Sequence, residues 1–101
     1  MFPPGVAMAF EREYGCTETE WLRDLPAAAA PQALMLEPPS RARVMIHPGL
    51  LHLQWAVLPP RRIALLNMPR LHVSFQFEAV DASARQRFMK RFDLVLQRGG
   101  G

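Results

Sequence analysis

The sequence predicts an α+β fold, in which an antiparallel meander sheet of four to five or more strands carries a short N-terminal helix and a long C-terminal helix packed on one face. Residues 71–78 alternate strictly between apolar and polar side chains, which is typical of a sheet with one buried face. After Asp81, apolar side chains recur every three to four positions, which is typical of an amphipathic helix. The chain has 101 residues, of which 50% are hydrophobic, so we expect one core and one domain.

The two ends of the chain differ in composition from its middle. Residues 1–8 carry no charge and contain two prolines and a glycine, so we expect a disordered N-terminal segment, within which Met8 is an equally good start of the protein. The α+β domain is expected over residues 9–98, and the three glycines 99–101 form a flexible tail. The opening has no basic n-region, and no apolar stretch approaches about 20 residues, so we expect neither a signal peptide nor a membrane span.

The first ordered elements are a short strand over residues 11–15 and a helix of roughly two turns. Thr17 and Glu20 have the spacing of a capping box, in which each side chain satisfies the backbone amide of the other residue. Pro26 removes a backbone donor from a helix interior, so we expect this helix to end near Leu25. The alanines that follow could extend it.

Between this helix and Asp81 the apolar period changes to two. The segments expected as strands are residues 33–37, 41–46, 50–57, 62–66 and 71–78. Proline pairs end the first and third of these segments, because proline cannot donate to a sheet ladder. Residues 47–49 and 67–70 have the composition of turns.

The core is expected where the apolar face of the sheet meets the helices. The side chains that we expect to be buried in one cluster are Trp21, Trp55, Val73, Phe75, Phe77, Phe88 and Phe92. The last helix would contribute its apolar stripe to this cluster and keep its basic side chains on the opposite side.

Charge is divided unevenly along the chain. Residues 1–40 contain six acidic and two basic residues, a net charge of −4, whereas residues 41–101 contain ten basic and three acidic residues, a net charge of +7. This asymmetry indicates either a solvated surface with two complementary sides or a basic face for an acidic partner. Arginine, which provides eleven of the twelve basic residues, suits bidentate phosphate recognition, although a high-GC genome produces the same bias.

The candidate partner-binding residues are the basic side chains of two turns and of the last helix. They are Arg61, Arg62, Arg70, Arg85, Arg87, Lys90 and Arg91. Arg61 and Arg62 follow two prolines on a stiff loop, and we expect Arg70 at the opposite end of a short strand, about 15 Å away. The last helix is long enough to bridge that distance, so the expected partner is an extended acidic surface.

The residue types that carry catalysis or bind metals are few and scattered. The chain has three histidines, and no helix places two of them on one face; His52 and His72 are expected on the polar sheet face, about 10 Å apart. Cys16 precedes a helix N-terminus, where the dipole stabilises a thiolate, but no histidine lies near it in the sequence. The glycines form no phosphate-binding loop. We therefore expect no catalytic centre, metal site or cofactor.

Four motifs distinguish the chain: EWL at 20–22, LPPRRI at 58–63, MPRL at 68–71 and the ending QRGGG, which follows Phe92-Asp93. With these motifs the chain resembles a family of small uncharacterised proteins of proteobacteria. The resemblance covers nearly the whole chain and implies a bacterial origin, but it implies no activity.

We interpret the sequence as a non-catalytic accessory or protein-interaction module, in which the arginines contact an acidic protein surface. The single cysteine favours a reducing compartment, and we expect the cytoplasm. One alternative is a nucleic-acid-binding domain that uses the same arginines; the polar face of residues 71–78 lacks the aromatic side chains that stack bases. A less favoured alternative is a pocket for a small apolar ligand between the sheet and the last helix. The oligomeric state is open.

Overall fold

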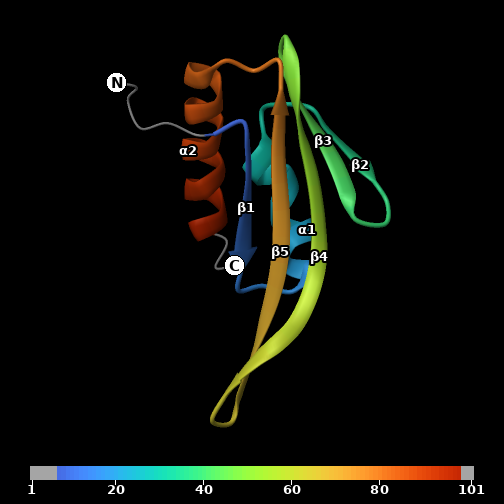
Figure 1. Ribbon diagram of the computed structural model, residues 1–101, viewed down its shortest axis with the longest axis vertical. Coiled ribbons are helices and arrows are strands. Elements are labelled where there is room, and N and C mark those ends of the chain that lie inside the picture. Colours follow the sequence, from blue (N-terminus) through green and yellow to red (C-terminus); the bar gives the residue numbers. More distant parts are fainter. Residues whose placement is uncertain (1–6, 99–101) are drawn as a thin grey trace.

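The computed structural model describes residues 7–98, which form a single sheet and two helices (Figure 1). The elements are β1 (Ala9–Tyr14), α1 (Glu18–Ala29), β2 (Leu34–Glu37), β3 (Arg41–Ile46), β4 (Gly49–Ile63), β5 (Leu66–Glu78) and α2 (Ala82–Arg98). The strand order is β1-β5-β4-β3-β2, and all neighbours are antiparallel. This arrangement confirms the predicted α+β class. The expected tail at 99–101 and residues 1–6 of the expected N-terminal segment lie outside the described residues.

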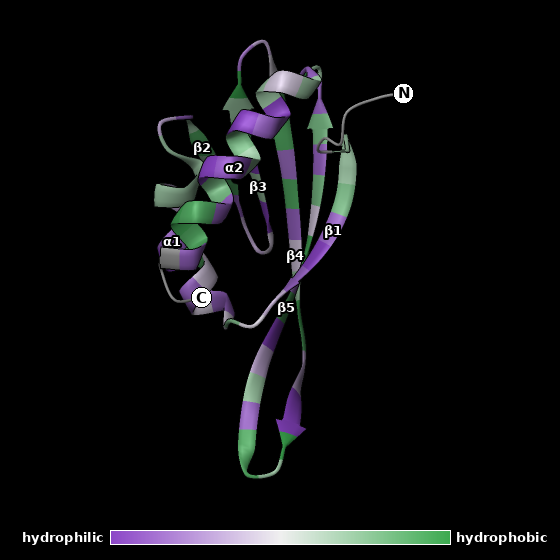
Figure 2. Cartoon of the chain, turned by 90° about the vertical axis from the view of Figure 1, so that its left-hand side faces the viewer, coloured by the Kyte–Doolittle hydropathy of each residue, from purple (hydrophilic) through white to green (hydrophobic). Residues whose placement is uncertain are grey.

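Both helices cover the same face of the sheet, and the core lies between them and the strands (Figure 2). All seven side chains predicted to form the core are buried. Trp21 from α1 packs edge-on against Trp55 of β4 and against Phe92 of α2, with ring centroids 5.6 and 6.1 Å apart. Aromatic rings from the two layers therefore join both helices to the sheet.

The edge strand β1 alternates as its sequence predicts, with Phe10, Arg12 and Tyr14 partly buried and the two glutamates between them exposed. Its ladder with β5 already includes Met8, whose carbonyl accepts a hydrogen bond of 2.7 Å from the Phe77 amide. The ring of Phe10 stacks on Phe75 at 4.7 Å, so the edge strand is fixed to the core by side chains as well as by its backbone.

Helix α1 begins with the predicted capping box and extends one turn further than expected. The Glu20 amide donates to Thr17 Oγ1 over 3.1 Å, and the Thr17 amide donates to Glu20 Oε1 over 2.8 Å. Pro26 lies inside the helix, which is a correction to the predicted end near Leu25. Good helix formers follow the proline, and burial of Ala28 and Ala29 stabilises the added turn.

The long β4–β5 hairpin differs most from the prediction. The segment expected as a separate strand at 62–66 and the turn expected at 67–70 do not form. Instead β4 continues through Pro59 and Pro60 to Ile63, and the chain reverses at Ala64, whose φ is 55°. The two prolines lie at a register shift between Leu58 and Arg61, where a bulge lets the ladder resume beyond them.

Helix α2 begins after Asp81, whose Oδ1 accepts the Ala84 amide over 2.8 Å as the predicted cap. Its buried side chains Phe88, Met89 and Phe92 face the sheet. Neither of the two described helices is long and apolar enough to cross a bilayer.

Candidate partner-binding site

The β4–β5 hairpin projects beyond the rest of the sheet as a two-stranded arm (Figure 1). We define the arm as residues 57–70, because β3 ends its pairing with β4 at Gln54 and β1 pairs with β5 only from Leu71 onwards. Its ladder extends from the pair Leu58–Arg70 to the pair Ile63–Leu66. The arm is therefore flanked by no other strand and exposes both of its edges.

Large apolar side chains are unusually exposed on the arm. Val57, Ile63, Leu65, Leu66 and Met68 are between 45% and 101% exposed. Leu65, at the end of the arm, contacts nothing that reduces its exposure. Exposed apolar surface is common at interaction sites, and five such side chains lie within the fourteen residues of the arm.

Three prolines prevent the arm from pairing with another strand. Pro59 and Pro60 occupy the bulge in β4, and Pro69 lies opposite them in β5. None of these residues has an amide hydrogen to donate, so this level of the arm is a poor template for strand addition. At this level of the arm, a partner would contact side chains and not add a strand.

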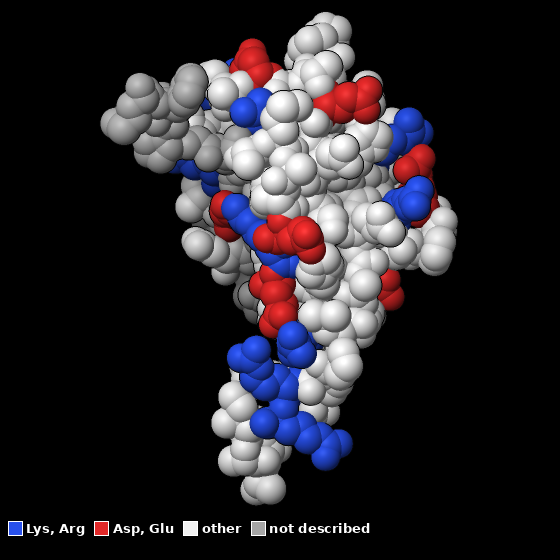
Figure 3. Space-filling view, viewed as in Figure 1, with Lys and Arg blue, Asp and Glu red and all other residues white. Residues whose placement is uncertain are grey.

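The predicted arginines fall into two separate groups, which is a correction to the expected single face. Arg61, Arg62 and Arg70 lie on the arm, where Figure 3 shows blue side chains gathered on the narrow projecting part of the molecule. The remaining four lie in the first ten residues of α2. Figure 1 shows that this part of α2 lies at the end of the sheet away from the arm, so the helix does not bridge the two groups.

Within the arm, Arg61 and Arg70 lie close together and not at opposite ends of a strand. Arg70 donates from Nε and Nη2 to the two carboxylate oxygens of Glu13, over 3.0 and 2.8 Å. Arg61 Nη2 lies 3.9 Å from the same carboxylate. The expected separation was wrong because it placed the turn at 67–70; in the actual ladder Arg61 pairs with Met68, two positions from Arg70.

The root of the arm is the pair Leu58–Arg70, where the hairpin leaves the rest of the sheet. It is joined to the edge strand β1, and Trp55 of β4 next to it is joined to the helix layer. The hydrogen bonds from Arg70 lower the pKa of Glu13, so this carboxylate is ionised at neutral pH. On the other side, the indole Nε1 of Trp55 donates to Glu18 Oε2 over 2.8 Å. These contacts join β5 to β1 where the arm begins, and β4 to α1 two residues before it.

A hollow of about 370 Å³ lies between the root of the arm and the start of α1. Apolar atoms form most of its lining. The residues around it are Cys16, Thr17, Glu18, Val57, Leu58, Pro60, Asn67, Pro69 and Arg70. The charged residues of its lining are Glu18 and Arg70, and Glu18 already accepts the indole hydrogen bond of Trp55.

The basic residues of α2 are mostly engaged within the chain. Arg85 donates to the Val80 carbonyl over 2.7 Å, and Arg91 donates to the Ala30 carbonyl over 2.6 Å. Arg87 donates to Ser83 Oγ one helical turn earlier. These bonds fix the loop before α2 and the residue that follows α1, so this group has a structural role that the sequence did not indicate.

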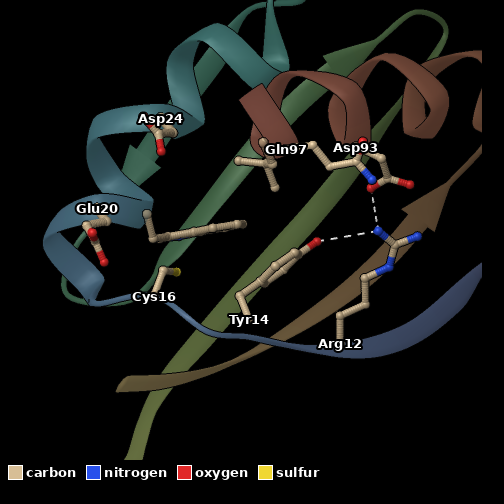
Figure 4. Close-up of a pocket in the computed structure, with 9 residues that line it drawn as sticks. Arg12, Tyr14, Cys16, Glu20, Asp24, Asp93 and Gln97 are labelled. Carbon is tan, nitrogen blue, oxygen red and sulfur yellow. Dashed lines mark hydrogen bonds and ion pairs between the residues drawn. The ribbon is translucent and has the colours of Figure 1, made fainter. Parts of the chain in front are cut away.

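A second hollow, of about 240 Å³, opens between β1, α1 and the end of α2 (Figure 4). Arg12 forms an ion pair with Asp93 and lies 3.5 Å from the Tyr14 hydroxyl. Cys16 is buried, and burial is the main cause that raises the pKa of its thiol, so the thiolate suggested by its place before a helix is disfavoured. Apolar atoms form most of the lining of this hollow, and Arg12, Glu20, Asp24 and Asp93 are its charged residues.

The histidines predicted on the polar sheet face have carboxylate partners. His52 Nε2 lies 2.9 Å from Glu78 Oε1, and His72 Nε2 lies 2.5 Å from Glu11 Oε1. Among the described residues, no group of three or more side chains has an arrangement that could hold a metal ion.

Sequence reasoning identified the arginines of the arm but missed its apolar end. The run IALL at 63–66 was the available signal, because four apolar residues at a strand end have no polar alternation. Comparison with known proteins adds no assignment: no family model matches the chain, and no curated protein is significantly similar to it.

Proposed function

We propose that this protein is a non-catalytic binding module that docks on an acidic protein surface through the β4–β5 arm. The observation that carries this proposal is the combination of a fully exposed apolar end with arginines directly behind it. Interfaces typically contain a buried apolar centre and a polar rim in which arginine is enriched. Leu65 would provide the centre, and Arg61 and Arg62 would provide the rim.

Charge supports the choice of an acidic partner. From Pro38 to Phe77 the sequence contains no acidic residue, so the arm carries only positive charge. Among the described residues, Arg62 forms no ion pair within 4 Å, whereas Arg70 is occupied by Glu13. Arg62 is thus the arm cation best placed to meet a partner carboxylate, and such pairs increase association rates and specificity.

The proposal is tested by photo-crosslinking in the living cell. A photoreactive residue at position 65 should crosslink to a protein partner, and the same residue at position 94, an exposed leucine of α2, should not. With the purified partner, the double variant Arg61→Ala/Arg62→Ala should bind at least about tenfold more weakly at low salt. The matched double variant Arg87→Ala/Lys90→Ala should bind like the wild type. Equal losses in both variants, or equal crosslinking at both positions, would contradict docking through the arm.

A nucleic-acid interface is the second candidate, because a two-stranded ribbon with arginines and an apolar end resembles the arms that some proteins insert into the minor groove. It is less favoured because only three arginines lie on the arm and Glu13 pairs with two of them, Arg61 and Arg70. Titration with single- and double-stranded oligonucleotides at about 50 and 200 mM salt distinguishes a nucleic-acid partner from a protein partner. Tight binding that weakens steeply with salt and is lost in Arg61→Ala/Arg62→Ala would show that the partner is a polynucleotide and not a protein.

A further inference from the structure

A third hollow, of about 430 Å³, lies where the end of α1, the turn between β3 and β4, and helix α2 meet. Figure 1 places this region toward the end of the sheet away from the arm. The charged or titratable side chains in its lining are His47, Arg87 and Arg91, and no acidic residue contributes to the lining. A neighbouring hollow on α2 shares both arginines and adds Lys90, again without an acidic residue. We call the first of these two the basic hollow.

The cations around the basic hollow have no acidic partner within the described chain. Among residues 7–98, no carboxylate lies within 4 Å of Arg87, Lys90 or Arg91, whereas five other arginines have such a partner. Arg87 precedes Lys90 by three positions and Arg91 by four, so these like charges are neighbours on one side of the helix. Repulsion between them destabilises the helix, and a bound anion would relieve it.

Two hydrogen bonds orient the arginines and leave most of their donors free. Arg91 Nε donates to the Ala30 carbonyl over 2.6 Å, which holds this guanidinium beside the hollow. Arg87 Nη1 donates to Ser83 Oγ. The two terminal nitrogens of Arg91 and the Nε and Nη2 atoms of Arg87 have no hydrogen-bond partner in the described part of the chain. Both guanidinium groups therefore retain N–H groups that can donate to one anion.

We propose that the basic hollow binds a phosphate monoester of a small apolar molecule, with the phosphate between Arg87 and Arg91. A phosphate monoester carries nearly two negative charges at neutral pH and three acceptor oxygens, which suits two guanidinium groups better than a carboxylate does. His47 belongs to the same lining and is a third side chain that can donate a hydrogen bond.

The rest of the lining suits the apolar body of such a ligand. Ile46 of β3 and Phe88 of α2 are 5% and 8% exposed, so packing in the core fixes their positions, and Pro31 adds a rigid apolar surface. The volume of the hollow lies within the range of about 300–1,000 Å³ that is common for small-molecule sites. Because none of these residues belongs to the arm, this inference does not depend on the proposed function.

Titration with phenyl phosphate, followed by amide chemical shifts, tests the site directly. The amides of Gln32, His47 and Arg91 should shift together and saturate with a Kd below about 1 mM, while the amides of Leu65 and Leu66 on the arm should not move. Inorganic phosphate, which lacks the apolar body, should bind at least about tenfold more weakly, and phenol, which lacks the charge, should not bind. Shifts that do not saturate, or that are equal on the arm, would overturn the proposal.

Three variants separate a built site from a general attraction to positive charge. Arg87→Gln should keep its melting temperature, because this side chain is exposed, and should bind phenyl phosphate at least about tenfold more weakly. The matched control Arg62→Gln removes the same charge from the arm and should bind like the wild type. Arg91→Lys keeps its charge but loses the planar pair of donors, so it should also weaken binding. Equal losses in Arg87→Gln and Arg62→Gln, or undiminished binding by Arg91→Lys, would contradict a phosphate site between the two arginines.

Vesicle flotation distinguishes the two sources of a phosphate monoester, a soluble molecule and a lipid headgroup. The probes are phosphatidylcholine vesicles with and without phosphatidic acid, whose headgroup is a phosphate monoester. Binding that requires phosphatidic acid and is lost in Arg87→Gln would support the site and identify the headgroup as its ligand. Binding of phenyl phosphate without binding to either vesicle would support the site with a soluble ligand. A protein that binds neither phenyl phosphate nor these vesicles would overturn the proposal and leave docking through the arm unaffected.

Discussion

Arg70 and Glu13 form a two-point ion pair between the root of the arm and the edge strand β1, with nitrogen–oxygen distances of 3.0 and 2.8 Å. The guanidinium also donates from Nη1 to the Pro59 carbonyl over 3.3 Å, so a single side chain joins β1, β5 and β4. This junction lies where the three-stranded part of the sheet becomes the two-stranded arm. Because the Arg70–Glu13 pair lies where the arm begins, we expect this pair to set the direction of the arm.

Glu13→Gln should therefore loosen the arm with little effect on the fold. Both side chains are exposed to solvent, so we expect a small fall in melting temperature but faster backbone motion at Leu65 and Leu66, measured by amide relaxation. Glu37→Gln, which removes the partner of Arg43 at the opposite edge of the sheet, should leave the arm unchanged. Equal effects of the two variants on the arm would show that Glu13 does not control it.

The same pair predicts a dependence on pH. Because hydrogen bonds from Arg70 lower the folded-state pKa of Glu13, its contribution to stability is present above the unfolded pKa and is lost as pH falls through the folded one. Arm motion should thus increase below about pH 4 in the wild type, and Glu13→Gln should not show that change. Amide relaxation of Leu65 and Leu66, measured between about pH 3 and pH 7 in the wild type and in Glu13→Gln, checks this dependence.

The contact between Glu18 and Trp55 offers a test of how strand β4 is joined to the helix layer. Trp55 is 4% exposed and donates its indole hydrogen to Glu18 Oε2 over 2.8 Å. Glu18→Ala would leave this buried donor without its acceptor, so we expect a loss of about 1–3 kcal/mol in the free energy of unfolding. The loss should shrink in a Trp55→Phe background, because the donor is then absent. Chemical denaturation of the four proteins measures the coupling, and additive losses would show that the bond contributes nothing.

The packing of Phe75 against Phe92 gives the largest expected effect on stability. The rings meet edge to face with centroids 5.7 Å apart, and both side chains are fully buried. Phe75→Ala or Phe92→Ala should cost about 3–5 kcal/mol, through lost apolar burial and the cavity left behind. The matched change Leu94→Ala, at an exposed position of α2, should cost far less. Losses below about 1 kcal/mol for either phenylalanine in denaturant unfolding would contradict their central place in the core.

The sequence predicted the parts of the fold in which local patterning and burial agree. Strict alternation in residues 71–78 and the capping box at Thr17 each favour one structure, and both formed as expected. Local propensity alone predicts a helix end at Pro26. Burial of Ala28 and Ala29 against the core, a tertiary effect, outweighs the lost backbone bond.

The arm was the part that sequence reasoning could not place. Asn67-Met68-Pro69-Arg70 has the composition of a turn, but Pro69 lies on the part of β5 that does not pair with β1, and it faces the bulge of β4. The true reversal at Ala64 contains neither glycine nor asparagine. Because the turn was misplaced, Arg61 and Arg70 were expected far apart although both approach Glu13.

A substitution at Gly49 tests whether the β3–β4 turn must approach the end of β5 closely. It is the first residue of β4, and a Cβ atom at this position would lie 1.9 Å from the Glu78 carbonyl oxygen and 2.5 Å from the Ala79 carbonyl carbon. Both atoms belong to the backbone, which cannot rotate away as a flexible side chain would. Gly49→Ala should therefore force the two segments apart and destabilise the fold by about 1–3 kcal/mol.

Gly15→Ala is the matched control, because no heavy atom lies within 4 Å of a Cβ built there. Thermal unfolding of the two variants compares them directly. Equal melting temperatures would show that the turn accommodates a side chain and that the close approach at Glu78 is not required.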